Sequence, residues 1–222
     1  MPKAQETILE IDLNALKHNF DYLKSKLQND TKFLAVVKAF AYGNEANKIA
    51  SYLQSLNVDY FAVAYVKEGI ALRNAGITKP ILVLHPQTVN FEELIENCLE
   101  PSLYNWKILN EFIEIAEAKN QKEYPVHIKF NTGLNRLGFW ENDVDIVCSK
   151  IKNSSTIKAA SIFSHLAASE DLNEKDFSLQ QINTFKLIAK NMMDKLGYRP
   201  MLHMCNTSGI LNYPKAHFDM VR

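Results

Sequence analysis

Phe33-Leu34-Ala35-Val36-Val37-Lys38-Ala39 is an apolar, partly β-branched run without polar alternation, and a lysine stands close to its end. Such runs are typical of parallel strands that are covered on both faces. Similar segments follow at fairly even intervals: Tyr60 to Tyr65, Ile81 to Leu84, Ser102 to Tyr104, Val126 to Phe130, Ile157 to His165, Met201 to Asn206 and Asp219 to Arg222. The run at 33–39 is therefore expected to be the first of eight parallel strands.

Amphipathic segments lie between these strands. In the segment 107–119, Ile108, Leu109 and Phe112 recur at helical spacing. The segments 47–56, 66–75 and 178–196 have the same character. Strand–helix alternation predicts an α/β fold with right-handed crossovers, and eight strands is the number that closes a TIM-type (β/α)8 barrel.

The two ends of the chain differ from a complete barrel. Ile8 to Leu13 alternates apolar and polar residues, which predicts an additional N-terminal strand before a helix over 13–27. That strand either caps the bottom of the barrel or belongs to a sheet completed elsewhere. The eighth strand coincides with the last four residues, whereas a complete barrel continues into another helix. We therefore expect residues 13–222 to form a barrel that is truncated after its eighth strand.

Composition narrows the classes of function. The 222 residues include 25 basic and 25 acidic side chains, so the formal net charge is zero. There is then no electrostatic reason to expect a nucleic acid or an anionic membrane as a partner. No apolar run approaches the roughly 18 residues of a membrane-spanning helix, and the N-terminus lacks the apolar core of a secretory signal. Cys98, Cys148 and Cys205 form no CxxC pair, which favours a reducing, cytoplasmic compartment and argues against disulfides and metal sites.

Polar residues stand at the carboxyl ends of five predicted strands, where barrels of this class carry their chemistry. They are Lys38 after the first strand, Lys129 and Arg136 after the fifth, Ser164-His165 after the sixth, His203 to Gly209 after the seventh, and Arg222 after the eighth. Each has an ordinary structural explanation, since a lysine can reach solvent, a histidine can be a hydrogen-bonded core residue, and Asn206 can cap a helix. Their convergence on one mouth predicts a functional site.

Lys38 and the segment after the seventh strand narrow the chemistry further. A lysine in a barrel mouth can form a Schiff base with an aldehyde. Thr207, Ser208 and the amides that open the next helix suit a phosphate, which such barrels commonly hold at this position. The combination suits pyridoxal phosphate, and it would also suit a phosphosugar aldolase.

Six segments resemble motifs of alanine racemases, which are fold type III pyridoxal-phosphate enzymes. Val37 to Gly43 resembles their cofactor-lysine motif, Glu10 to Leu16 their N-terminal signature, and Lys129 to Gly138 their Lys-x-Asp-Thr-Gly-Met-x-Arg-Leu-Gly segment. Ser164-His165, His203 to Asn206 and Asp219 to Arg222 follow in the family's order, near its spacing. The resemblance covers essentially the whole chain and implies the N-terminal, pyridoxal-phosphate-binding barrel domain.

The resemblance implies a role for each matching residue. Lys38 would hold the cofactor and transfer the Cα proton of alanine, while Tyr42, Asn206 and Thr207 would bind the cofactor and its phosphate. His165 would lie beside the pyridine ring, Arg136 would contact the substrate, and Lys129, carbamylated in many members, would support Arg136. Arg222 would donate to the pyridine nitrogen, and because a guanidinium keeps its protons, that nitrogen stays unprotonated. Reprotonation at Cα is then favoured over transamination.

The resemblance also implies an isomerase that interconverts L- and D-alanine for peptidoglycan synthesis as a homodimer. The family has a second, β-rich domain that supplies an opposing tyrosine base, so we expect residues 1–12 to pair with that missing domain and the barrel to be inactive alone. Phe40, Asn44 and Asn131 stand where many members have Asp, His and Asp. The variant with Phe40 resembles the branch in which the racemase domain is fused to a Mur-type ligase.

Three other functions compete with a racemase. The first is a single-domain pyridoxal-phosphate homeostasis protein of the same barrel class, which has a comparable length and no established catalysis. The second is a basic-amino-acid decarboxylase of the same fold type, and the third is a structural module within a fusion protein. The segment 131–138 and Arg222 argue against the homeostasis protein. Arg222 also argues against the decarboxylase, because decarboxylases of this type typically place a carboxylate at the pyridine nitrogen.

Overall fold

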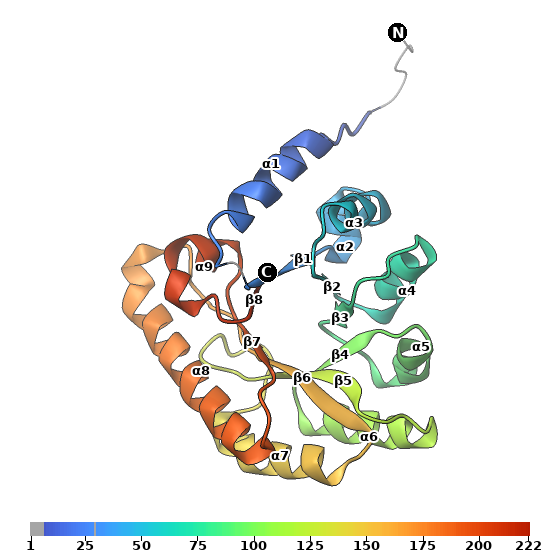
Figure 1. Cartoon of the computed structure of the whole chain (residues 1–222), viewed down its shortest axis with the longest axis vertical. Helices are drawn as coiled ribbons and strands as arrows, with labels where there is room; N and C mark the ends of the chain where they lie inside the picture. Colours follow the sequence, from blue (N-terminus) through green and yellow to red (C-terminus); the bar gives the residue numbers. More distant parts are fainter. Residues whose placement is uncertain (1–6, 29) are drawn as a thin grey trace.

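Eight parallel strands form a closed barrel in the computed structural model, which describes residues 7–28 and 30–222 (Figure 1). They are β1 (Lys32–Val36), β2 (Tyr60–Val63), β3 (Ile81–Val83), β4 (Glu100–Leu103), β5 (Tyr124–Lys129), β6 (Ile157–Phe163), β7 (Met201–His203) and β8 (Met220–Val221). Each strand pairs with the next, and β8 closes the ring against β1 through Lys32↔Met220 and Phe33↔Val221. The predicted TIM-type barrel is confirmed.

Helices surround the strands (Figure 1). They are α1 (Leu13–Lys24), α2 (Lys38–Gly43), α3 (Ala46–Ser55), α4 (Val66–Asn74), α5 (Phe91–Glu96), α6 (Trp106–Ala118), α7 (Val144–Asn153), α8 (Lys175–Leu196) and α9 (Thr207–Asn212), with short 3-10 turns η1 (Thr88–Asn90), η2 (Glu141–Asp143), η3 (Leu172–Glu174) and η4 (Pro214–Ala216). The segments predicted at 47–56, 66–75 and 107–119 match α3, α4 and α6 to within one residue at each end. Within the described part of the chain, no helix combines the length and apolar character that a membrane crossing requires.

The strand predictions extend past the observed carboxyl ends. The strand expected over 33–39 stops at Val36, and the strand expected over 201–206 stops at His203. Val37, Met204 and Cys205 are nevertheless buried. Their apolar character reflects packing in the turns that lead to α2 and α9, because burial does not require pairing in the sheet.

Two separate layers of side chains pack against the strands. Phe61, Val126 and Ile128 face outward and are fully buried in the layer between the strands and the helices. The barrel interior holds a smaller apolar group, consisting of Leu34, Tyr60, Ala62, Leu82 and Met220. Because side chains alternate along a strand, His127 faces inward between Val126 and Ile128. The interior therefore contains buried polar groups on strands β4 to β7, namely Glu100, His127, Ser161 and His203.

The N-terminal segment differs from the sequence prediction. Residues 7–12 belong to no strand, and α1 begins at Leu13, with the Asp12 carboxylate accepting from the amides of Asn14 (2.8 Å) and Ala15 (3.2 Å). Ile8 and Leu9 are exposed. The strand expected at 8–13 is thus wrong for this structure, because an extended segment forms a strand only beside a hydrogen-bonding neighbour. Pairing of residues 1–12 with a separate domain stays a prediction, and residues 1–6 lie outside the described residues.

The loop after β5 passes very close to itself at Gly138. The amide of Phe139 donates to the carbonyl of Lys129 (2.9 Å), and the amide of Asn131 donates to the carbonyl of Phe139 (2.8 Å). Gly138 has a φ of +136°, and a Cβ there would lie 2.5 Å from the backbone nitrogen of Asn131. The shape of this loop therefore depends on the absence of a side chain at position 138.

Gly138→Ala should lower the free energy of unfolding by roughly 2–4 kcal/mol, because backbone strain and a backbone clash add together. The matched control is Gly76→Ala, since Gly76 also has a positive φ (+85°) but no atom within 4 Å of the added Cβ. The control should lose only about 1 kcal/mol. Midpoints of urea unfolding measure both changes, and equal losses would contradict the role of the close approach.

Candidate active site

The eight residues predicted for the site line one cavity of about 650 Å³ at the carboxyl ends of the strands. They are Lys38, Tyr42, Lys129, Arg136, His165, Asn206, Thr207 and Arg222. They come from positions as distant in sequence as 38 and 222, and the closed barrel brings them together. The volume is typical of small-molecule sites. The convergence expected from the sequence is therefore observed, while the role of each residue stays a prediction.

Lys38 opens an unusual turn directly after β1. The four residues from Ala39 to Tyr42 all have left-handed φ values, between 52° and 57°. A left-handed conformation costs about 1–2 kcal/mol for each residue with a Cβ. Lys38 and Tyr42, at the two ends of this turn, both line the cavity. Strain of this kind clusters at functional sites, where the surrounding structure holds it in place.

Glu68, on α4, holds the lysine turn in place. One carboxylate oxygen accepts from the amide of Ala39 (2.7 Å), and the other accepts from the amides of Ala64 (2.7 Å) and Tyr65 (3.0 Å). The carboxylate thus ties the residue after Lys38 to the end of β2. Sequence reasoning missed Glu68, although a glutamate at the third position of a helix is a recognisable capping signal.

Arg136 lies in the loop after β5, and Asn131 organises that loop. The Asn131 side-chain oxygen accepts from the amides of Gly133 (3.2 Å) and Asn135 (2.9 Å), and its nitrogen donates to Oδ1 of Asn135 (2.8 Å). Arg136 itself is exposed and reaches the cavity from its rim.

Arg222, directly after β8, donates to groups at the ends of two neighbouring strands. Its guanidinium donates to the carbonyl of Ser164 (2.5 Å), to Nδ1 of His165 (2.7 Å) and to Nδ1 of His203 (2.9 Å). A guanidinium has no lone pair to offer, so both imidazoles accept at Nδ1. Burial, with the nearby charge of Arg222, lowers the pKa of His165 to about 3, and His165 is therefore neutral at ordinary pH.

The segment after β7 combines a helix cap with a cavity wall. The Asn206 side-chain oxygen accepts from the amide of Gly209 (2.9 Å) and from the Ser169 hydroxyl (2.7 Å), so it caps α9. The helix-cap explanation considered from the sequence is therefore correct for this side chain. Thr207, the next residue, is exposed and also lines the cavity.

The cavity carries an excess of positive charge. Lys38, Lys129, Arg136 and Arg222 line it, and no aspartate or glutamate stands among its described lining residues. Burial, together with the charges of Arg136, Arg222 and Lys38, lowers the pKa of the Lys129 ammonium to about 8. This arrangement favours an anionic ligand, such as a phosphate or a carboxylate, which would offset the mutual repulsion of the cations.

Lys129→Met should stabilise the ligand-free chain at pH 7 by roughly 1–3 kcal/mol, because it removes a buried charge and keeps most of the apolar stem. An unfolded lysine keeps its proton up to the ordinary pKa of 10.5, whereas folded Lys129 loses it near 8. The unfolded chain thus binds more protons between these values, and wild-type stability rises with pH across that window.

The advantage of Lys129→Met should therefore be largest below pH 8 and vanish above about pH 10.5. Urea unfolding at several pH values measures it. Lys107→Met is the control, since the Lys107 side chain is 72% exposed and should show no such dependence. Destabilisation by Lys129→Met at pH 7 would contradict the electrostatic interpretation.

Comparisons with known proteins agree on one family. A family model described as alanine racemase, N-terminal domain, matches residues 11–222. The alanine racemase of Thermodesulfovibrio yellowstonii is 37% identical over 216 residues, covering 96% of this chain and 57% of the relative. Alanine racemase 1 of Caldanaerobacter subterraneus subsp. tengcongensis is 32% identical over 223 residues, covering 99% of this chain and 56% of the relative.

Solved structures that resemble this chain are also alanine racemases. Alanine racemase of Clostridium difficile 630, in complex with cycloserine, matches with a TM-score of 0.90 at 32% identity, covering 96% of this chain and 58% of that one. Alanine racemase of Bacillus anthracis with bound L-Ala-P matches with a TM-score of 0.89 at 26% identity, covering 100% of this chain and 57% of that one.

The chain spans 56–57% of the length of these two sequence relatives. Members of the family depend on pyridoxal phosphate, and apart from Glu10 the motifs on which the resemblance rests lie within the matched region. The chain belongs to the alanine racemase family, and residues 11–222 correspond to its N-terminal domain.

Proposed function

We propose that this barrel binds pyridoxal phosphate through Lys38 and takes part in racemising alanine. The observation that carries the proposal is a cavity in which Lys38 and three further cations meet, with no carboxylate among the lining residues that the structure describes. Such a cavity suits a ligand that bears a phosphate and an aldehyde, and afterwards a substrate that bears a carboxylate. These residues therefore fit the cofactor on which the family depends.

Different residues of the cavity would bind different parts of the cofactor. When bound, pyridoxal phosphate supplies a conjugated ring that accepts the electron pair left on Cα as the proton departs. We assign the phosphate to Tyr42 and Thr207, beside the Asn206 cap, and the covalent attachment to Nζ of Lys38. The Lys38 amine would also be the base that takes the proton from Cα of the substrate.

Arg222 and His165 would control the ring. Arg222 keeps its protons near neutral pH and can only donate, so it would hydrogen-bond the ring nitrogen of the cofactor without protonating it. A ring nitrogen without a proton withdraws fewer electrons, which favours return of the proton to Cα. His165 is neutral, with a pKa of about 3, and adds no charge beside the ring.

Lys129 and Arg136 complete the proposal. Two neighbouring cations favour an anion between them, and a carbamate formed from the Lys129 amine and carbon dioxide would supply it. The lowered pKa of Lys129, about 8, makes the reactive neutral amine available at physiological pH. Arg136 would then be held by the carbamate and face the substrate carboxylate.

The remaining assignments concern the protein of which such barrels form part. The two alanine racemase relatives are considerably longer than this chain, which covers 56–57% of their length. We propose alanine as substrate, D-alanine supply for peptidoglycan synthesis as purpose, a homodimer as assembly and the cytoplasm as location. Racemisation also uses a second acid–base group on the face of Cα opposite Lys38.

Borohydride reduction of the chain loaded with pyridoxal phosphate should place the pyridoxyl mass on the peptide that contains Lys38. Lys38→Arg should abolish both this label and the visible absorbance of the Schiff base. Lys107→Arg, on an exposed face of α6, is the control and should leave both intact. Peptide mass spectrometry reads the result, and a label on Lys129 in place of Lys38 would refute the assignment.

Glu68→Gln should weaken cofactor attachment about tenfold, since one glutamine oxygen cannot accept all three amides and a lost hydrogen bond to a charged group costs about 1.5 kcal/mol. The control is Asp143→Asn, because the Asp143 carboxylate accepts from the amide of Trp140 (2.7 Å) at the start of η2, outside the cavity lining. Titration of Schiff-base absorbance measures attachment. Equal effects of the two variants would show that Glu68 only stabilises the fold.

A further inference from the structure

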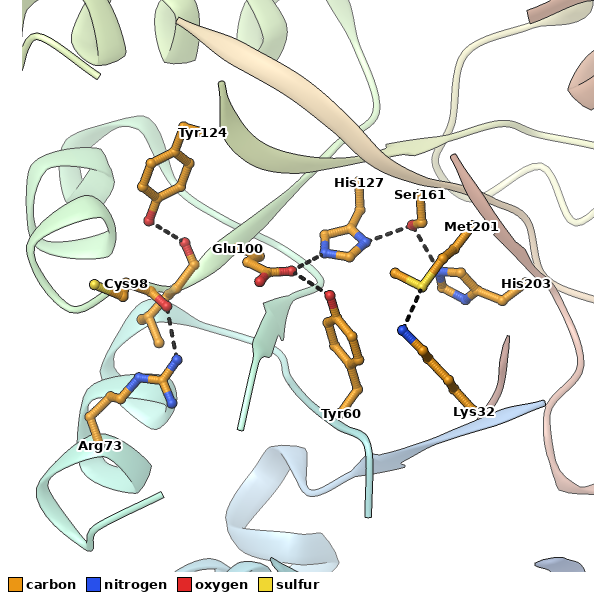
Figure 2. A network of polar contacts seen from close by, with 11 residues as sticks. Lys32, Tyr60, Arg73, Cys98, Glu100, Tyr124, His127, Ser161, Met201 and His203 are labelled. Atoms are coloured by element: carbon orange, nitrogen blue, oxygen red, sulfur yellow. Dashed lines mark hydrogen bonds and ion pairs between the residues drawn. The ribbon is translucent and has the colours of Figure 1, made fainter. Parts of the chain in front are cut away.

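A chain of hydrogen bonds runs through the barrel interior from its bottom to Arg222. Nε2 of His127 lies 2.7 Å from Oε2 of Glu100, and Nδ1 of His127 lies 2.6 Å from the Ser161 hydroxyl. The same hydroxyl lies 3.1 Å from Nε2 of His203, whose Nδ1 accepts from Arg222. Figure 2 shows the part from Glu100 to His203, with each member on a different strand.

The chain is buried along its length. His127, Ser161 and His203 are fully inaccessible to solvent, and Glu100 is 8% exposed. Glu100 is the first residue of β4, at the bottom of the barrel, whereas His203 is the last residue of β7, next to the cavity. Solvent therefore does not reach the hydrogen-bonding atoms of His127, Ser161 and His203.

The two ends fix the direction in which every member donates. Arg222 cannot accept, so Nδ1 of His203 is the acceptor and its Nε2 carries the proton. That proton goes to Ser161, whose own proton goes to Nδ1 of His127. The remaining His127 proton, on Nε2, goes to the Glu100 carboxylate, which can only accept. One tautomer of each histidine satisfies all four contacts.

The reverse direction would break the contact at the cavity. If the group at position 100 donated to Nε2 of His127, the proton of His127 would move to Nδ1 and point at Ser161. Ser161 would then donate to Nε2 of His203, and the His203 proton would sit on Nδ1. That proton would face the guanidinium of Arg222, donor against donor.

We propose that Glu100 is a positioning residue, which acts through His127 and Ser161 to stabilise the tautomer of His203 that accepts from Arg222, and thereby helps to hold Arg222 in the cavity. Control of the tautomer stands on the hydrogen-bond chain alone. Only the consequence for the cofactor ring rests on the proposed function. Glu100 acts across the whole height of the barrel and contacts neither the cavity nor Arg222.

Glu100→Gln is the test, because glutamine keeps the shape of the side chain but can either accept or donate. Nitrogen-15 NMR of the histidine rings distinguishes the tautomers, since a protonated and an unprotonated ring nitrogen give different signals. In the unchanged chain, His127 and His203 should each show a single form, protonated at Nε2. Glu100→Gln should add a second population of His203, protonated at Nδ1.

Tyr60→Phe is the matched control. The Tyr60 hydroxyl donates to the same Oε2 of Glu100 (3.2 Å), so this variant removes a buried hydrogen bond from the carboxylate but leaves an obligate acceptor in place. The tautomers should not change. If Glu100→Gln does not fold, Ser161→Ala interrupts the same chain while Glu100 and His127 stay paired. It removes the acceptor that favours the Nε2 form of His203, so it too should add a population protonated at Nδ1.

Cofactor binding gives a second, quantitative measurement. If only the form of His203 that is protonated at Nε2 holds Arg222 in its binding orientation, the measured dissociation constant for pyridoxal phosphate equals the intrinsic constant divided by the fraction of chains in that form. A half-populated form thus predicts about a twofold loss. Tyr60→Phe should bind like the unchanged chain.

The possible outcomes are distinguishable. A single, unchanged tautomer of His203 in Glu100→Gln, or a doubly protonated His127 in the unchanged chain, would overturn the inference. Mixed tautomers with the predicted loss of affinity would support it. Mixed tautomers in a chain that does not bind pyridoxal phosphate would support the control of His203 by Glu100 and refute the proposed function.

Discussion

The guanidinium of Arg222 is the group on which the rest of the site depends. It stands where β8 closes the barrel, and its donors reach the ends of β6 and β7 through Ser164, His165 and His203. Because it cannot accept a hydrogen bond, it imposes the acceptor role on both histidines. Burial, which disfavours its charge, lowers its pKa to about 10, so the guanidinium is still protonated near neutral pH.

Unbalanced positive charge is the second constraint. Lys38, Lys129, Arg136 and Arg222 surround a cavity whose described lining contains no carboxylate, while Glu100 lies at the bottom of the barrel. Glu68 uses its charge on backbone amides rather than on these cations. The arrangement leaves the cavity poorly compensated without a ligand and well suited to an anionic one. Strain in the turn 39–42 and charge in the cavity are two forms of free energy stored at the same place.

The barrel fold and the convergence of the site residues could be predicted from the sequence for clear physical reasons. Apolar runs without alternation identify strands covered on both faces, so eight of them identify the barrel. The rule that strand ends meet at one mouth placed Lys38, His165 and Arg222 together. The strand at 8–13 failed because alternation shows only that a segment can be a strand, whereas a strand also needs a partner. The left-handed turn after Lys38 has no signal of its own, since it contains no glycine before Gly43.

The sequence by itself determined the fold class, the family and the residues that face the cavity, because these follow from periodicity and from motifs local in the chain. Only the tertiary structure decided which buried polar groups meet. A register shift between β5 and β6 pairs His127 with Ser161, whereas Val126 pairs with Ala159. Ala160 is skipped, and the hydrogen bond between His127 and Ser161, which joins Glu100 to His203, depends on that shift. Register is set by how the strands pack in the closed barrel, and a pattern with a period of two residues does not specify it.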